Sequence, residues 1–269
     1  MIWLLAAQAT AKGDRVINQD AAHVSEHLCV VADGLGGHNA GEVASALAVE
    51  ALVEARNTAV VSREATKSGG RLRQNVPLLP SIDELLGAVA EANRRVWDKS
   101  WSIVELKGMC TTLCVLAVVE KDAKELLAVV NIGDSRAYRC DEAGLWQLTQ
   151  DHTARQEAIK AGVDLALLKA NDLSKLSRTV GYEENVMADD WMFDPVYGHR
   201  YLLCSDGLTN AVTDSTIHSV LLECADPQEA ANALVVKALD CFAADNITVL
   251  VADVKETQMI SDPKVEKAR

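Results

Sequence analysis

The segment LCVVADGLGGH, residues 28–38, indicates both the fold of this chain and the place of its chemistry. It opens with a short apolar run that is typical of a buried β-strand. Asp33 and Gly34 follow this run directly. A carboxylate at the end of a buried strand is unfavourable unless a partner neutralises its charge. Taken alone, however, an Asp-Gly pair at a strand end is most often a simple turn.

Four further aspartates repeat this setting, and their number changes the interpretation. They lie beside apolar runs or turn-forming residues at Asp20, Asp134, Asp206 and Asp245. Carboxylates that converge repel one another unless a cation lies between them. Mg²⁺ and Mn²⁺ prefer oxygen ligands and keep several waters, and a glycine lets a backbone carbonyl approach such an ion. Cysteine and histidine are not clustered in the sequence, which argues against zinc.

The remaining apolar pattern predicts an α+β fold. Short runs rich in β-branched residues predict strands at 28–32, 111–119, 126–132, 201–204 and 247–251. Helical spacing occurs from residue 43 onward, at 82–97 and at 230–239, and Ser81 with Glu84 forms a plausible capping box for the second helix. Strands and helices do not alternate strictly, so we expect helices packed outside sheets and not βαβ units.

Three segments look less regular. Residues 56–80 mix Ser, Gly and Arg with several breakers and predict an exposed connection. Residues 152–185 are polar, contain a short helical pattern at 155–161 and predict a surface flap. Residues 255–269 are highly charged and predict a tail. We therefore expect one catalytic domain, residues 1–254, followed by that tail.

Composition bounds the class of protein. The chain has 269 residues, about half of them apolar, which is enough for a sizeable core. Its net charge of −13 disfavours nucleic acid or an anionic membrane as the main partner. Seven scattered cysteines without a CxxC pair predict reduced thiols. No apolar window is long enough for a membrane span, so the expected location is cytoplasmic.

Taken in order, the acidic motifs resemble the metal-dependent protein phosphatase 2C family, particularly its bacterial members. The resemblance covers nearly the whole chain, and the ordered set is far more specific than any one motif. The matching elements are Arg15 with NQD at 18–20, VADGLGGH at 31–38 with AGE at 40–42, TT at 111–112, IGDSRAY at 132–138, DHT at 151–153, LCSDGL at 203–208 and DNIT at 245–248.

The resemblance implies a four-layer α-β-β-α sandwich, in which two antiparallel sheets are flanked by helices and two to three Mn²⁺ or Mg²⁺ ions lie at one end. Asp33 would bridge two ions, and Gly34 would donate its carbonyl to one of them. The other implied metal ligands are Asp206 and Asp245 at the first site, Asp20 at the second, and Asp134 with Asp206 at a weaker third site.

The implied activity is hydrolysis of phosphoserine and phosphothreonine in proteins by a metal-activated water. Arg15 would grip the substrate phosphate through charge-assisted hydrogen bonds, and His38 is a candidate proton donor to the departing oxygen. The expected partners are phosphorylated proteins, such as a bacterial serine/threonine kinase or its targets, and the expected oligomeric state is a monomer.

Two departures from the family pattern keep alternatives open. Gln19 stands where some relatives carry a metal-binding glutamate, and Cys110 precedes the threonine pair where bacterial relatives usually have glycine. A catalytically inactive pseudophosphatase scaffold is one alternative, although the retained aspartates argue against it. A hydrolase of small phosphate esters is another, because a metal centre attacks phosphorus in either case.

Overall fold

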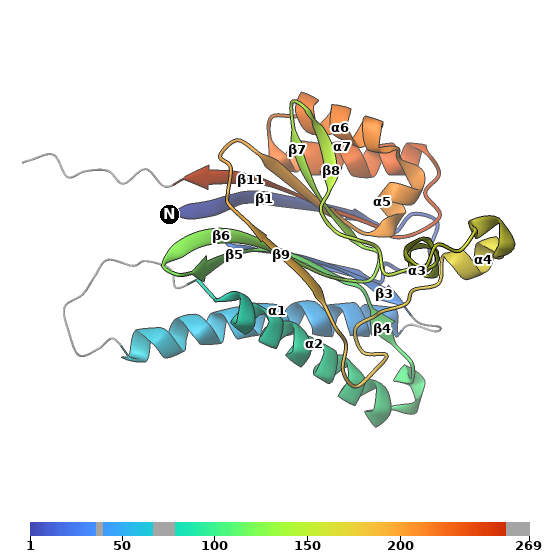
Figure 1. Ribbon diagram of the computed structural model, residues 1–269, viewed down its shortest axis with the longest axis horizontal. Helices are drawn as coiled ribbons and strands as arrows, with labels where there is room; N and C mark the ends of the chain where they lie inside the picture. Colours follow the sequence, from blue (N-terminus) through green and yellow to red (C-terminus); the bar gives the residue numbers. More distant parts are fainter. Residues whose placement is uncertain (36–39, 67–78, 257–269) are drawn as a thin grey trace, which may run out of the picture.

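The structure of the protein, a computed structural model, describes residues 1–35, 40–66 and 79–256. Two antiparallel sheets stack face to face, and a layer of helices covers each outer face (Figure 1). The expected α+β sandwich is therefore confirmed. At one end of the sandwich, α3 (Ala154–Lys160) and α4 (Ala170–Leu173) project beyond the sheets (Figure 1).

The first sheet has the strand order β1-β11-β10-β7-β8. Its strands are β1 (Ile2–Ala11), β11 (Ile247–Glu256), β10 (Arg200–Cys204), β7 (Arg136–Asp141) and β8 (Gly144–Gln147). Helices α5 (Asp206–Ala211), α6 (Asp214–Glu223) and α7 (Pro227–Asp240) cover its outer face, as Figure 1 shows.

The second sheet has the order β2-β3-β5-β6-β9, and the short strand β4 pairs with β3. Its strands are β2 (Asp20–Ser25), β3 (Leu28–Leu35), β4 (Cys110–Thr111), β5 (Leu113–Lys121), β6 (Lys124–Ile132) and β9 (Asp189–Phe193). The two long helices α1 (Gly41–Thr66) and α2 (Ile82–Ser102) cover it.

Burial on both faces explains why some strands were visible in the sequence. In β5, Leu113 and Val115 pack toward α1 and α2, whereas Cys114 and Leu116 pack between the sheets. A strand buried on both sides reads as a continuous apolar run. In contrast, every residue of β2 is only partly buried. Its apolar signal is correspondingly weak, and β1, β2, β7, β8 and β9 were not predicted.

The helices differ from the prediction in extent. The capping box of α2 is confirmed, since Glu84 N donates to Ser81 Oγ and Ser81 N donates to a Glu84 carboxylate oxygen. Helix α1, however, continues through Thr66. The prediction of an exposed connection from residue 56 was thus wrong for its first part, because no glycine or proline interrupts residues 56–66. Helices α5 and α6 are short and were not predicted.

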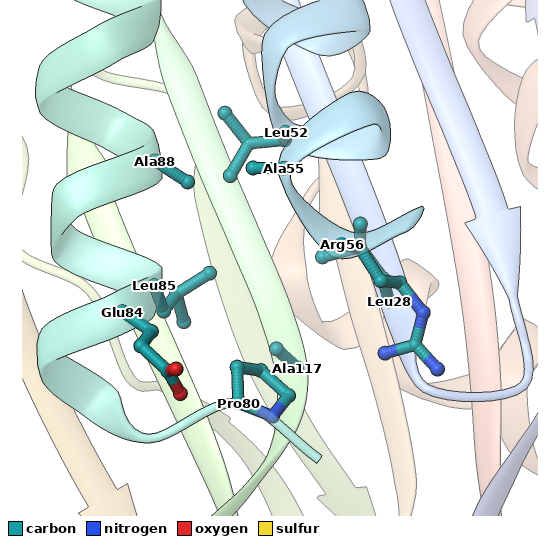
Figure 2. A pocket seen from close by; sticks show the side chains of 9 residues that line it. All are labelled: Leu28, Leu52, Ala55, Arg56, Pro80, Glu84, Leu85, Ala88 and Ala117. Atoms are coloured by element: carbon teal, nitrogen blue, oxygen red, sulfur yellow. The ribbon is translucent and has the colours of Figure 1, made fainter. Parts of the chain in front are cut away.

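A small cavity lies between α1 and α2 (Figure 2). Its volume of about 40 Å³ has room for a few water molecules at most. Arg56 lines it and contacts His27 Nδ1 at 2.9 Å. Burial lowers the pKa of Arg56. None of the five predicted aspartates lines this cavity.

The predicted flap, residues 152–185, contains α3 (Ala154–Lys160), a 3₁₀ turn η2 (Leu165–Leu167) and α4 (Ala170–Leu173). Its base is fixed to the sandwich: Val180 and Thr111 exchange two backbone hydrogen bonds of 2.8 and 3.0 Å. Buried Asn93 on α2 accepts from Gly181 N at 2.7 Å. A further 3₁₀ turn, η1 (Val104–Leu106), follows α2.

The cysteines and the termini complete the fold. All seven cysteines are free, as predicted, and four of them are buried. Strand β11 continues through Glu256, and the rest of the predicted tail lies outside the described residues. Among the helices of the described part, none is long and apolar enough to cross a membrane.

Candidate metal centre

The structure brings the five predicted aspartates to one end of the sandwich. Asp20 begins β2 and is the register partner of Asp33 in β3. Asp206 begins α5 immediately after β10, Asp245 precedes β11, and Asp134 lies in the turn from β6 to β7. Burial raises the pKa of Asp33 well above its usual range, and the charges of all four other aspartates raise it further. The five carboxylates therefore form one electrostatic cluster.

Asp33 lies inside β3 and not at its end, which corrects the sequence prediction. The strand continues through Leu35 because β4 pairs with it at Gly34 and Leu35. Asp33 N donates to Thr112 Oγ1 at 2.9 Å, and Asp33 O accepts from Thr112 N and from Thr111 Oγ1. The threonine pair, to which the sequence reading gave no role, thus fixes the backbone that carries the central carboxylate.

Gly34 occupies a position with no room for a side chain. A Cβ atom there would lie 2.1 Å from Gly41 O and 2.5 Å from Gln19 O. Gly34 N donates to Gln19 O at 3.2 Å. The strand, the start of α1 and the loop before β2 therefore meet at this glycine, and only glycine permits their close approach.

In Asp20 and in Asp206, one carboxylate oxygen accepts a hydrogen bond and the other accepts none from the described residues. Ser205 Oγ donates to Asp20 Oδ2 at 2.8 Å, and Asn210 Nδ2 donates to Asp206 Oδ2 at 3.0 Å. The Oδ1 atoms of both aspartates are buried and accept no hydrogen bond from any described residue. Burial raises the pKa of Asp20 to about 6. Burial, followed by the charge of Asp245, raises the pKa of Asp206.

Asp134 is presented by a turn that requires glycine. Gly133 has a φ of 106°, and a Cβ atom there would lie 2.7 Å from the Thr112 side chain. Burial and then the charges of Asp206 and Asp151 raise the pKa of Asp134 to about 7. The carboxyl of Asp134 therefore belongs to the same cluster. The turn that carries it is hydrogen-bonded through Gly133 to His152 at the start of the flap.

Arg15 reaches the cluster through Asp245. Its Nη2 donates to Asp245 Oδ2 at 2.8 Å, and the Arg15 side chain remains 57% exposed. A guanidinium that is both held at the carboxylates and open to solvent can still bind an incoming anion. His38, the predicted proton donor, lies outside the described residues.

Asn246 holds the loop that carries Arg15, a role that the sequence reading missed. Its Oδ1 accepts from Gln19 N at 2.8 Å, and its Nδ2 donates to the carbonyls of Lys12 and Ile17, both at 2.9 Å. The residue is buried. Local sequence does not indicate this role, because the backbone partners of the amide lie more than two hundred residues away along the chain.

Gln19 shows the consequence of the first departure from the family pattern. Its Nε2 donates to Glu42 Oε2 at 3.2 Å, and its backbone carbonyl accepts from Ser45 Oγ at 2.6 Å. The neutral amide therefore adds no charge to the cluster. The carboxylate that Gln19 contacts belongs to Glu42 on α1.

The donor set fits a hard divalent cation. The converging groups offer only oxygen, two carboxylate oxygens are buried without a partner, and the carboxylates repel one another. Within residues 1–35, 40–66 and 79–256, no three Asp, Glu, His or Cys side chains stand ready as a complete ligand cage. Mg²⁺ and Mn²⁺ do not require such a cage, since water and backbone carbonyls complete their coordination.

Comparison with known proteins gives a consistent result. Residues 9–240 match the family model described as protein phosphatase 2C. The serine/threonine phosphatase stp of Listeria monocytogenes is 33% identical over 250 residues, which cover 90% of this chain and 92% of that protein. The serine/threonine protein phosphatase PstP of Mycobacterium tuberculosis is 32% identical over 93% of this chain and 45% of its own length.

Solved structures agree. The catalytic domain of serine/threonine protein phosphatase PstP, in complex with two manganese ions, superposes with a TM-score of 0.76 at 32% identity, covering 95% of this chain and all of that chain. The phosphatase MsPP of Mycobacterium smegmatis, in complex with cacodylate, gives a TM-score of 0.72 at 33% identity, covering 92% of this chain and 97% of that chain.

Proposed function

The chain belongs to the protein phosphatase 2C family of metal-dependent serine/threonine phosphatases, and we propose that its aspartate cluster is the catalytic metal centre. It hydrolyses phosphoserine and phosphothreonine in proteins with Mn²⁺ or Mg²⁺ as cofactor. The observation that carries the site assignment is the convergence of four aspartates on the buried carboxyl of Asp33.

In this proposal, Asp33 would contribute to two cation sites, and the Gly34 carbonyl would contribute to one of them. Asp206 and Asp245 would complete the first site, and Asp20 would support the second. Asp134 would combine with Asp206 in a third. The unpartnered Oδ1 atoms of Asp20 and Asp206 support this assignment, because each is a buried acceptor that a cation would satisfy.

The cations, when bound, supply the Lewis acidity that activates water and neutralises charge on the phosphoryl group. The residues of the chain position the reactants. Arg15 binds the phosphate oxygens through its guanidinium, and Asn246 holds the loop on which Arg15 lies. Thr111 and Thr112 keep Asp33 from moving. The assignment of His38 as proton donor stays a prediction.

The proposed partners are phosphoproteins modified by a serine/threonine kinase, or the kinase itself, and the proposed state is a monomer. The relatives from Listeria monocytogenes and Mycobacterium tuberculosis are serine/threonine phosphatases, which supports a phosphoprotein substrate. The pseudophosphatase alternative is disfavoured because the aspartate cluster is retained. The proposed catalytic domain, residues 1–254, includes the whole range matched by the family model.

Phosphate release from a phosphothreonine peptide tests the function directly. Protein stripped of metal with a chelator is expected to release no phosphate, and addition of Mn²⁺ or Mg²⁺ is expected to restore release. A small ester such as p-nitrophenyl phosphate, assayed beside the peptide, tests the remaining alternative, a hydrolase of small phosphate esters. Equal catalytic efficiency on both substrates would support a hydrolase of small esters.

Arg15→Ala is expected to raise KM for a phosphopeptide about tenfold or more, with a smaller change in kcat. The reason is the loss of a charge-assisted hydrogen bond to the phosphate, which contributes roughly 1.5–3 kcal/mol. Steady-state kinetics with saturating Mn²⁺ measure both constants. Arg94→Ala is the matched control, since Arg94 is also ion-paired and 58% exposed but lies on α2. An unchanged KM with a large loss of kcat would contradict the role.

A further inference from the structure

The cap that follows the C-terminus of helix α7 is unusual, because it contains Phe242. The amide of Phe242 donates to Leu239 O at 2.9 Å, and the amide of Ala243 donates to Ala238 O at 3.1 Å. This pair of hydrogen bonds defines the Schellman motif, which places the first residue beyond the helix in the left-handed region. Phe242 accordingly has a φ of 57°. Glycine is the residue that this conformation favours.

The same motif occurs elsewhere in the chain with the expected residue. At the end of α3, Gly162 N donates to Ile159 O and Val163 N donates to Ala158 O. Gly162 has a φ of 69°. Two helices of this protein thus end with the same hydrogen bonds and the same backbone conformation. One uses glycine, whereas the other uses a bulky aromatic residue, for which positive φ is a genuine outlier.

Packing does not explain the phenylalanine either. The Phe242 side chain is 86% exposed, so its ring gains almost nothing from burial. An exposed aromatic ring on a left-handed backbone is unfavourable on both counts. Backbone strain of this kind gathers at functional sites, where the surrounding structure holds it in place.

Phe242 lies three residues before Asp245, the ion-pair partner of Arg15, which is the proposed phosphate-binding residue. A Cβ atom on Gly13 would lie 2.8 Å from Ala243 O and 2.2 Å from Asp245 O, so the loop before β2 packs against the segment after α7. That loop exposes two more apolar side chains, Val16 at 90% and Ile17 at 36%. We call Val16, Ile17 and Phe242 the apolar rim.

We propose that the apolar rim is a specificity-determining surface that binds an apolar side chain flanking the phosphorylated residue of the substrate protein. The inference rests on the proposed function. A substrate segment is the proposed occupant because Val16 and Ile17 follow Arg15 directly in the chain, and Phe242 lies three residues before Asp245, with which Arg15 is ion-paired. When Arg15 binds the phosphate, the neighbouring residues of the substrate pass along the loop before β2 and the segment after α7. An apolar side chain of the substrate at the apolar rim would bury the ring of Phe242. Ordering this ring on binding costs little side-chain entropy.

Phe242→Gly separates this role from a structural one. Removing the left-handed strain is expected to raise Tm by about 3 °C. On phosphothreonine peptides that carry a single leucine at each flanking position in turn, wild-type protein is expected to favour at least one position. The variant is expected to lose that preference, with a roughly tenfold fall in kcat/KM for the favoured peptide relative to p-nitrophenyl phosphate. Phe242→Leu is expected to retain much of the wild-type preference for leucine.

Ala123→Gly is the matched control. Ala123 also has positive φ, at 61°, but it lies in the hairpin between β5 and β6. Its replacement is expected to raise Tm similarly and to leave the peptide preference unchanged. The proposal would be overturned if wild-type protein showed no leucine preference, or if Phe242→Gly retained it. Loss of ester hydrolysis in wild-type protein with Mn²⁺ would instead refute the proposed function.

Discussion

Asp206→Asn is expected to lower metal-dependent phosphate release by at least about a thousandfold. The substitution removes a charged oxygen donor from the proposed centre, and metal ions contribute several kcal/mol to stabilising the transition state. A thousandfold loss corresponds to about 4 kcal/mol. The fold is expected to survive, because burial and the charge of Asp245 make ionised Asp206 unfavourable in metal-free protein. Phosphate release and Mn²⁺ binding, followed by calorimetry, measure the effect.

Asp214→Asn provides a control of the same local structure. Asp206 and Asp214 each begin a short helix directly after a Ser or Thr N-cap, so both interact with a helix dipole in the same way. Asp214 is exposed and lies outside the cluster. Its replacement is expected to leave turnover within about twofold of wild type. Near-normal turnover of Asp206→Asn would refute the site assignment.

The second large effect is a pH dependence of stability that metal removal reveals. Burial first, and neighbouring charges in addition, raise the pKa of Asp20 to about 6 and that of Asp134 to about 7. Their usual value of 3.8 applies to the unfolded chain. At a pH between 3.8 and these raised pKa values, the two carboxyl groups keep their protons in the native state and have lost them in the unfolded state. The free energy of unfolding of metal-free protein therefore falls as pH rises through this range.

A shift of one pKa unit is equivalent to about 1.4 kcal/mol, so the two shifts, about five units together, correspond to about 7 kcal/mol at full strength. Both residues are partly exposed to solvent, which screens their charges, and we therefore expect a contribution on the order of 3 kcal/mol. Chelated protein is expected to lose roughly 5–10 °C in Tm between about pH 5 and about pH 8. Saturating Mn²⁺ is expected to raise Tm most at the higher pH, because cations bind the deprotonated carboxylates. Thermal melts with chelator and with Mn²⁺ test this.

Asp134→Asn is the internal control for that experiment, since it removes one of the two titrating groups. Its chelated form is expected to show a shallower decline of Tm with pH than wild type. A Tm of chelated wild-type protein that rises from about pH 5 to about pH 8 would refute the expectation. A stabilisation by Mn²⁺ that is independent of pH would contradict the assignment of these carboxylates as ligands.

How much of the site the sequence predicted depends on what each residue contacts. Asp33 and Asp206 were identifiable because a charge beside a buried strand requires a specific reason. Asp20 was identifiable from its place in the NQD element at 18–20. Asn246 was not, because its three partners lie more than two hundred residues away along the chain, in the segment from Lys12 to Gln19. Its function depends on a contact between distant segments that local pattern does not encode.

The fold divides in the same way. The sequence by itself determined the central strands such as β5, whose two buried faces require an unbroken apolar run. It also determined the α2 cap and the identity of the family. Only the tertiary structure decided that Asp33 lies within β3, since β4 comes from a distant segment to extend the pairing. It also decided that Phe242 adopts a left-handed conformation and stays exposed, because exposure and backbone angle follow from packing and not from residue order.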